Sequence, residues 1–155
     1  MQIQVSCDRI WTGRTGTDYL ADGTCITPGT FLQTGWYWRN GQQQQLTLAY
    51  QEDGNFVEYR WIAGQGYGTA IWSSGTPGQP QGTAALQRDG NFVLYKPGGS
   101  ASYWSTNTWN CGGNWPLKTL QLQEDENIVL YFWPPNGNTG NRVAKWDAWG
   151  NARGC

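Results

Sequence analysis

The residues best suited to chemistry in this sequence belong to one pattern, Gln-x-Asp-x-Asn-x-Val-x-Tyr, which occurs at 51–59, 87–95 and 123–131. The copies begin 36 residues apart (87 − 51 = 123 − 87), a period typical of a repeated supersecondary unit. A carboxylate, two amides and a phenol offer many hydrogen-bond donors and acceptors, and the valine adds an apolar contact. This combination suits a ligand covered in hydroxyl groups. The candidate binding residues are Gln51, Asp53, Asn55, Val57, Tyr59, Gln87, Asp89, Asn91, Val93, Tyr95, Gln123, Asp125, Asn127, Val129 and Tyr131.

The same pattern is poorly suited to catalysis. The chain contains no histidine and no activated serine or cysteine arrangement, and each copy has one constant carboxylate where glycoside hydrolysis uses two. Glu52 and Glu124 adjoin the motif aspartate in two copies, but Arg88 takes that position in the other. We therefore expect a protein that is not an enzyme and has no catalytic residues. The alternative, that the polar residues only decorate solvated hairpins, does not explain why five identical side chains recur.

The elements that must position these residues are predicted to be β-hairpins. Cross-strand partners share one face of a sheet, and successive residues alternate between faces. A three-residue loop at 52–54 pairs Gln51 with Asn55 and separates polar from apolar positions, whereas a two-residue turn mixes them. The loop also places Gly54 where left-handed backbone is needed. The same register predicts the inward pairs Tyr50 with Phe56, Leu86 with Phe92, and Leu122 with Ile128.

A tryptophan follows each hairpin in a similar context, at Trp72, Trp104 and Trp146. Such rings can stack on sugars, but a tryptophan repeated once per structural unit is more often part of a core. We therefore assign these three to packing. Separately, Asn40-Gly41 is the strongest two-residue signal for a hairpin turn in the chain.

Composition favours an all-β protein with one domain over 1–155, in which residues 1–23 form an N-terminal extension without a copy of the repeat. The 155 residues include 11 Trp, 8 Tyr and 22 Gly, and aromatic residues favour strands while glycine favours turns. The formal charge is −1 without a Lys/Arg cluster, so we expect no nucleic-acid partner. No apolar run approaches the roughly 20 residues that span a bilayer, and we expect neither membrane insertion nor an uncleaved signal peptide.

The four cysteines, Cys7, Cys25, Cys111 and Cys155, favour disulfides over a zinc site, because none forms a C-x-x-C pair and histidine is absent. No metal and no cofactor are therefore predicted. Three connectivities are possible, and sequence proximity favours Cys7 with Cys25 and Cys111 with Cys155. Four buried thiols remain the alternative. Disulfides would place the protein in a secreted or otherwise oxidising compartment.

The repeated pattern, together with Gly29-x-x-Leu32-x-x-Gly35 and the tryptophan-containing strands, resembles the bulb-type mannose-binding lectins, the snowdrop agglutinin family. The resemblance covers about residues 24–150. It implies a β-prism II fold, in which three four-stranded antiparallel sheets surround a pseudo-threefold axis. It also implies one calcium-independent mannose site in each sheet.

By the same resemblance, Asp53 and Asn55 bond the axial 2-hydroxyl of mannose, Gln51 the 3-hydroxyl and Tyr59 the 4-hydroxyl, while Val57 lies against the ring carbons. The matching residues of the other two copies take the same roles. Contacts with an axial hydroxyl would separate mannose from glucose, because the polar groups of the site lose a partner when that hydroxyl is equatorial.

Two positions depart from the repeat. Glu58 stands where the other copies have leucine, and the predicted register points it inward. Either Arg60 or another base pairs with it, or the first sheet is distorted. Glu126 replaces the loop glycine of the first two copies, which costs about 1 kcal/mol if that residue must be left-handed. We expect the third loop to differ.

The sequence thus predicts a lectin that recognises mannose or mannose-rich glycans through up to three metal-free sites. Its partners are expected to be mannose-containing glycans or glycoproteins, and a homodimer is a possible further assembly. Several weak sites would gain avidity by engaging one glycan-covered surface. The alternative is a non-catalytic β-prism scaffold that binds a protein in place of a sugar.

Overall fold

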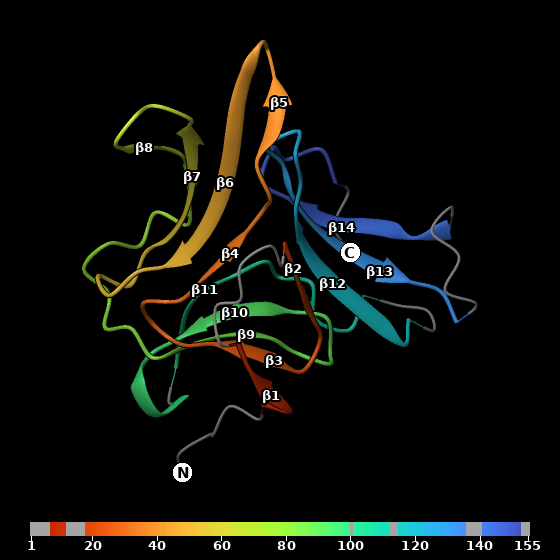
Figure 1. Cartoon of the computed structure of the whole chain (residues 1–155). Helices are drawn as coiled ribbons and strands as arrows, with labels where there is room; N and C mark the ends of the chain where they lie inside the picture. The colour runs from red at the N-terminus through yellow and green to blue at the C-terminus, as the bar shows by residue number, and fades with distance from the viewer. Residues whose placement is uncertain (1–6, 12–17, 100, 112–114, 136–140, 153–155) are drawn as a thin grey trace.

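The computed structural model describes residues 7–11, 18–99, 101–111, 115–135 and 141–152. Within them the chain forms three β-sheets and one short 3-10 turn, η1 (Pro97–Gly99). Figure 1 shows the three sheets facing one another around a common centre. The alternation of apolar and polar residues along the strands sends one face of each sheet to that centre.

Each sheet is organised around one motif hairpin. The first sheet has the order β4-β6-β7-β8, and β5 also pairs with β6; the second has the order β1-β3-β9-β10-β11; the third has the order β14-β13-β12-β2. The first and second sheets therefore exceed the predicted four strands, through β5 and through β1, which runs parallel to β3. The strands are β1 (Arg9–Ile10), β2 (Tyr19–Ala21), β3 (Thr24–Ile26), β4 (Phe31–Gln33), β5 (Tyr37–Arg39), β6 (Gln42–Tyr50), β7 (Phe56–Ile62), β8 (Gly68–Ser73), β9 (Thr83–Leu86), β10 (Phe92–Tyr95), β11 (Ser102–Ser105), β12 (Leu117–Leu122), β13 (Ile128–Trp133) and β14 (Val143–Asp147).

Three successive strands near the N-terminus, β2, β3 and β4, join three different sheets. Strand β2 pairs with β12 in the third sheet, β3 with β9 in the second, and β4 with β6 in the first. The predicted extension, residues 1–23, thus contains β2 as an integral strand of the third sheet. The predicted Cys7–Cys25 disulfide is confirmed, with a Cα–Cα distance of 5.7 Å. Cys155 lies outside the described residues, so its pairing with Cys111 stays a prediction.

The predicted hairpin register is confirmed in all three copies. Each motif glutamine accommodates the three-residue loop by donating its backbone N–H to the carbonyl of the motif asparagine at 2.9 Å. The inward pairs Tyr50 with Phe56, Leu86 with Phe92, and Leu122 with Ile128 are aligned across the strands, and all six side chains are at most 1% exposed. The Asn40-Gly41 turn also forms as predicted, because Arg39 lies opposite Gln42 and both turn residues have positive φ.

Three tryptophans pack together at the centre, as predicted. The rings of Trp72, Trp104 and Trp146 form a triangle with centroids 5.7 to 5.9 Å apart and interplanar angles of 71° to 86°. Edge-to-face contacts of this kind suit the charge distribution of aromatic rings. Because each ring comes from a different sheet, the triangle joins the three sheets at one point.

Each hairpin tip also contacts the next sheet around the centre. The Tyr103 hydroxyl of the second sheet donates to the Gly54 carbonyl at 2.8 Å. Gly90 lies against the end of the Phe132 ring in the third sheet, so closely that a Cβ there would overlap the ring. Glu126 bonds Arg60 in the first sheet. These contacts follow one direction around the molecule, as a threefold repeat requires.

Candidate functional site: three hairpin tips

The motif side chains gather at each hairpin tip because the loop folds the aspartate back over the strand. Asp53 Oδ1 accepts the backbone N–H of Asn55 at 2.9 Å, and the second and third copies repeat this bond at the same distance. Gly54 and Gly90 adopt φ of 88° and 92°, and Glu126 adopts φ of 77° despite its side chain. The third loop therefore keeps the backbone shape of the other two, and the expectation that it would differ is wrong for the backbone.

The motif glutamine and tyrosine meet in every copy. Gln51 contacts the Tyr59 hydroxyl, and Gln123 Nε2 donates to the Tyr131 hydroxyl at 2.8 Å. The side chain of Gln87 lies between Asp89 and Tyr95. With its amide nitrogen toward the carboxylate, it donates to both Asp89 oxygens, at 3.2 and 3.3 Å, while its oxygen accepts from the tyrosine. That orientation links three of the five motif side chains of the second copy.

The three motif valines lie deeper than the polar residues. Val57, Val93 and Val129 are 2%, 3% and 4% exposed. These valines therefore leave little of their side chains for a ligand to contact. The predicted contact of valine with ring carbons stays a prediction.

The motif asparagines of the first two copies are oriented by the residues that directly follow the outer strand of each sheet, β8 or β11. Asn55 Oδ1 accepts from Ser74 Oγ and from the backbone N–H of Thr76, each at 3.1 Å. Asn91 Oδ1 accepts from Thr106 Oγ1 and from the backbone N–H of Thr108, each at 3.2 Å. With the oxygen held in this way, the amide nitrogen makes no hydrogen bond to another described residue. It remains available as a donor to a ligand.

The third copy reverses this arrangement. Asn127 Nδ2 donates to Asp147 Oδ2 at 3.0 Å, while Asn127 Oδ1 is buried without a hydrogen-bond partner among the described residues. The reversal is enforced chemically, because an ionised carboxylate accepts hydrogen bonds and cannot donate them. Asn127 is also only 7% exposed. One of its two amide hydrogens is therefore committed to Asp147, and the buried residue offers little surface to a ligand.

Asp147 is itself held in its ionised form. Burial raises the pKa of this carboxyl, but hydrogen bonds from Asn127 and from the backbone N–H groups of Asn151 and Ala152 outweigh burial, so the pKa lies below its ordinary value. The two backbone donors lie 2.7 and 2.9 Å from Asp147 Oδ1. Of strand β14, only Trp146 is given a role from the sequence, in packing. The sequence nevertheless shows a contrast at the two positions after each tryptophan, which are Ser73-Ser74, Ser105-Thr106 and Asp147-Ala148.

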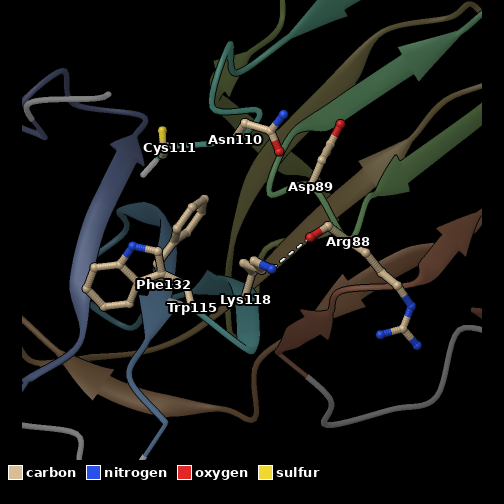
Figure 2. A pocket seen from close by; sticks show the side chains of 7 residues that line it. All are labelled: Arg88, Asp89, Asn110, Cys111, Trp115, Lys118 and Phe132. Atoms are coloured by element: carbon tan, nitrogen blue, oxygen red, sulfur yellow. Dashed lines mark hydrogen bonds between the residues drawn. The ribbon is translucent and has the colours of Figure 1, made fainter. Parts of the chain in front are cut away.

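A hollow of about 230 Å³ lies beside the second motif, between its loop and the third sheet. Lys118 Nζ donates to the Arg88 carbonyl at 2.7 Å. Figure 2 shows this bond, with the Arg88 guanidinium directed away from Trp115 and Phe132. The guanidinium pairs with Asp8 of the N-terminal segment. The second motif is therefore bordered by the third sheet and by the N-terminal segment.

An ion pair ties the third loop to the first sheet. Arg60 Nη2 donates to Glu126 Oε1 at 2.9 Å, Arg60 Nε contacts the other oxygen, and Gln44 Nε2 donates to Oε2 at 3.2 Å. The hydrogen bond from Arg60 holds the pKa of Glu126 below its ordinary value. This ion pair offsets the strain of a left-handed glutamate.

Glu58 points inward as predicted, but Arg60 bonds Glu126 and makes no bond to Glu58. Glu58 is 1% exposed, and its Oε2 has no hydrogen-bond partner among the described residues. Burial, reinforced by the charge of Glu126, raises the pKa of Glu58 to about 8. The side chain is thus protonated at neutral pH. All three sheets shift register at this position, so Glu58 does not distort the first sheet specifically.

Within the described part of the chain, no three side chains of the types that bind metals cluster together. The same residues contain no helix long and apolar enough to cross a membrane.

Comparison with known proteins gives matches among solved structures. No protein-family model and no curated protein sequence matches the chain. A monomeric monocot mannose-binding lectin from Gastrodia elata is 28% identical, with a TM-score of 0.57 over 85% of this chain and 96% of that one. The fold is β-prism II. A Marasmius oreades lectin is 22% identical, with a TM-score of 0.57 over 88% of this chain and 94% of its own. A mannose-specific lectin from Crocus vernus is 20% identical, with a TM-score of 0.55 over 79% of this chain and 94% of its own.

The prism confirms the predicted fold, with open sheets that do not close into a barrel. The structural neighbours are lectins, in agreement with the resemblance drawn from the motif.

Proposed function

We propose that this protein is a lectin that binds mannose or mannose-rich glycans without a metal ion, through the hairpin tips of its motif copies. The observation that carries the proposal is the arrangement of the first two tips. In each of these two hairpins an aspartate, a glutamine, a tyrosine and an asparagine with an uncommitted amide nitrogen lie close together. The fold, shared with lectins that bind mannose, supports the same conclusion.

The chemistry of the tip favours a hydroxyl-rich ligand over other small molecules. The motif aspartate has one oxygen engaged by the backbone. Its second oxygen can accept a hydroxyl, in the second copy beside the bond from Gln87, because each carboxylate oxygen can accept two hydrogen bonds. The asparagine nitrogen can donate to the same hydroxyl, so two neighbouring groups satisfy both its proton and its lone pair. An axial 2-hydroxyl, the feature that distinguishes mannose from glucose, is the group we assign to this pair. Glucose would leave both partners unsatisfied.

The three tips are not equivalent under this proposal. The first and second offer an aspartate oxygen and an asparagine nitrogen together. The third has lost the nitrogen to Asp147, and Arg142 covers its tyrosine ring at 4.2 Å. We therefore assign mannose binding mainly to the tips around Asp53 and Asp89.

Retention on immobilised mannose tests the proposal. We expect the protein to bind the resin, to elute with free mannose and to ignore a chelator. A triple variant, Asp53→Ala with Asp89→Ala and Asp125→Ala, should flow through while keeping the wild-type thermal midpoint within a few degrees. Full retention of the triple variant would show that the motif is not the binding site. Loss of wild-type binding in chelator would contradict a metal-free mechanism.

The disulfide between Cys7 and Cys25 supports a secreted or otherwise oxidising location, because such bonds persist where thiols are not kept reduced. Intact-mass measurement of protein from its native source, before and after reduction and alkylation, tests this assignment.

The exposed β5–β6 hairpin favours the alternative function, in which the protein binds a protein partner. The β5–β6 hairpin projects beyond the rest of the first sheet in Figure 1. Trp36 and Trp38, which lie before its turn, are 50% and 72% exposed. Exposed aromatic side chains are enriched at protein interfaces. A Trp38→Ser variant that loses glycoprotein binding but keeps binding to free mannoside would favour this alternative.

A further inference from the structure

Beside the first motif, the outer face of the first sheet carries a second hollow of about 280 Å³. It lies over β4, β6 and β7, and its lining includes Phe31, Gln33, Thr47, Ala49, Tyr59 and Trp61. Tyr59 belongs both to this hollow and to the motif, so the hollow begins where the proposed mannose site ends.

Trp61 forms a fixed wall of this hollow. Its indole Nε1 donates to Thr47 Oγ1 at 3.0 Å, and its ring lies 6.4 Å from the Tyr59 ring at an angle of 48°. Gly68 supports the ring from the neighbouring strand, where a Cβ would lie only 2.8 Å from Trp61 Cε2. The ring is therefore held in place before any ligand arrives, which lowers the entropic cost of binding.

The other two copies differ from the first at positions equivalent to those that line this hollow. In the second copy, Pro97 stands 36 positions after Trp61 (97 − 61), and no indole is present there. In the third copy, Trp133 repeats the indole bond, to Thr119 at 2.8 Å. There, however, Arg142 lies 4.2 Å from the Tyr131 centroid and 5.4 Å from that of Trp133. Gln121 also replaces the small Ala49 at the position opposite the motif valine.

We propose that the hollow beside Trp61 is a subsite for a second sugar residue, linked to the mannose held by the first motif. This inference rests on the proposed function. The C–H face of a pyranose ring carries slight positive charge and stacks on the negative face of an aromatic ring, as Trp61 and Tyr59 provide. Gln33 makes no side-chain hydrogen bond to another described residue, so its amide can meet the hydroxyls. The volume lies just below the range of about 300 to 1,000 Å³ typical of drug-sized ligands, and therefore suits one sugar ring.

The test uses the full chain with Asp89→Ala and Asp125→Ala, which leaves the first motif alone. Calorimetric titration compares methyl α-mannoside with an α-linked dimannoside. We expect the dimannoside to bind about five- to tenfold more tightly, and Trp61→Ala to remove that advantage. The matched control, Trp133→Ala, should keep it. In spectra of the ¹⁵N-labelled protein, the indole resonance that Trp61→Ala deletes should shift with dimannoside and stay in place with the monosaccharide.

A second variant distinguishes loss of the subsite from misfolding caused by Trp61→Ala. Gly68→Ala keeps the indole but pushes the ring toward the hollow, and it should also remove the dimannoside advantage. Equal affinities for the two sugars in the parent, or an advantage that survives both Trp61→Ala and Gly68→Ala, would overturn the subsite while leaving the lectin proposal intact. Absence of any mannoside binding by the unmutated protein would defeat the lectin proposal itself, and the subsite with it.

Discussion

The second and third copies of the motif carry the same five side chains, yet they present different atoms to solvent. Asn91 has its oxygen held by the residues that follow β11 and its nitrogen uncommitted, whereas the Asn127 nitrogen donates to Asp147. Their loops turn at Gly90 and at Glu126 with similar backbone angles. A motif therefore fixes the identity of the groups at a site, while the neighbouring strand decides which of their atoms a ligand can reach.

The difference between the two loops extends into the first sheet. Gly90 meets an apolar ring, whereas Glu126 draws Arg60 into an ion pair and leaves Glu58 buried without a base. One substitution in the third copy thus alters the electrostatics of the first.

The largest expected effect comes from this buried acid. Because the pKa of Glu58 is raised from 4.5 to about 8, this side chain takes up a proton on folding at any pH between these two values. Its contribution to stability is therefore complete below pH 4.5 and is lost as the pH rises to about 8. The shift (8 − 4.5) corresponds to a difference on the order of 5 kcal/mol. Glu58→Leu, which installs the residue of the second and third copies, should remove this decline. Urea unfolding between pH 4.5 and 9 measures it.

Glu58→Gln is the matched control, since its side chain keeps the shape of glutamate and cannot ionise. It should likewise remove the decline in the free energy of unfolding over this pH range. Glu126 acts in the opposite direction, because its lowered pKa makes its contribution full above pH 4.5 and weaker in more acid solution. Parallel pH profiles for wild type and Glu58→Leu would contradict the buried, protonated state.

A second prediction compares the loop residues directly. Gly90→Ala adds a Cβ in left-handed backbone against Phe132, and left-handed strain together with overpacking should reduce the free energy of unfolding by about 3 kcal/mol. Glu126→Gly relieves the same backbone strain but loses the bond to Arg60, so we expect a change within about 1 kcal/mol. Chemical denaturation measures both. A gain in the free energy of unfolding of more than about 1 kcal/mol in Glu126→Gly, the strain released in full, would mean that Glu126 gains nothing from Arg60.

A third prediction concerns binding, under the proposed function. Asp89→Ala should remove one mannose site from the stoichiometry, and Asp53→Ala with Asp89→Ala should weaken total binding about tenfold or more, because charged hydrogen bonds to the sugar are lost. Asp125→Ala should change total binding less than twofold. Calorimetric stoichiometry separates these outcomes. A large loss of mannose binding with Asp125→Ala would show that the third tip binds mannose as the other two do.

The smallest expected effect is a gain. Asp147→Ser with Ala148→Ser copies the closing strand of the first copy and should turn the Asn127 amide so that its nitrogen faces outward. We expect one added weak site, together with a loss of about 1 kcal/mol because Asn151 and Ala152 lose their shared acceptor. Chemical-shift changes of the Asn127 side-chain amide on adding mannoside provide the readout. An amide that stays silent would show that Asp147 does not control the third tip.

Much of the hairpin geometry was predictable from sequence, because it depends on local rules. Alternation of side chains across a strand has a period of two, so one loop length alone places Gln51 opposite Asn55 and sends Phe56 inward. Left-handed backbone at Gly54 follows from the same loop. These inferences need only neighbours within a few residues.

The orientation of the asparagine amides and the partner of Arg60 depend on contacts that no local rule provides. Arg60 and Glu126 are 66 residues apart, and they meet only because the third loop packs on the first sheet. Sequence patterns place Glu58 inward but do not reveal that Arg60 pairs with Glu126 and not with Glu58. The depth at which the motif valines are buried also depends on packing between segments that are far apart in the sequence.

The distribution of β2, β3 and β4 among the three sheets has a consequence for the order of folding. Leu20 pairs with Leu120, a separation of 100 residues (120 − 20), so a strand made early in synthesis must wait for a partner made late. Pairing across such a separation closes a long loop and is intrinsically slow. During synthesis the β12 edge has no partner until β2 docks, and exposed strand edges invite pairing between chains. The last step in forming the third sheet is therefore expected to limit both the folding rate and the yield of soluble protein.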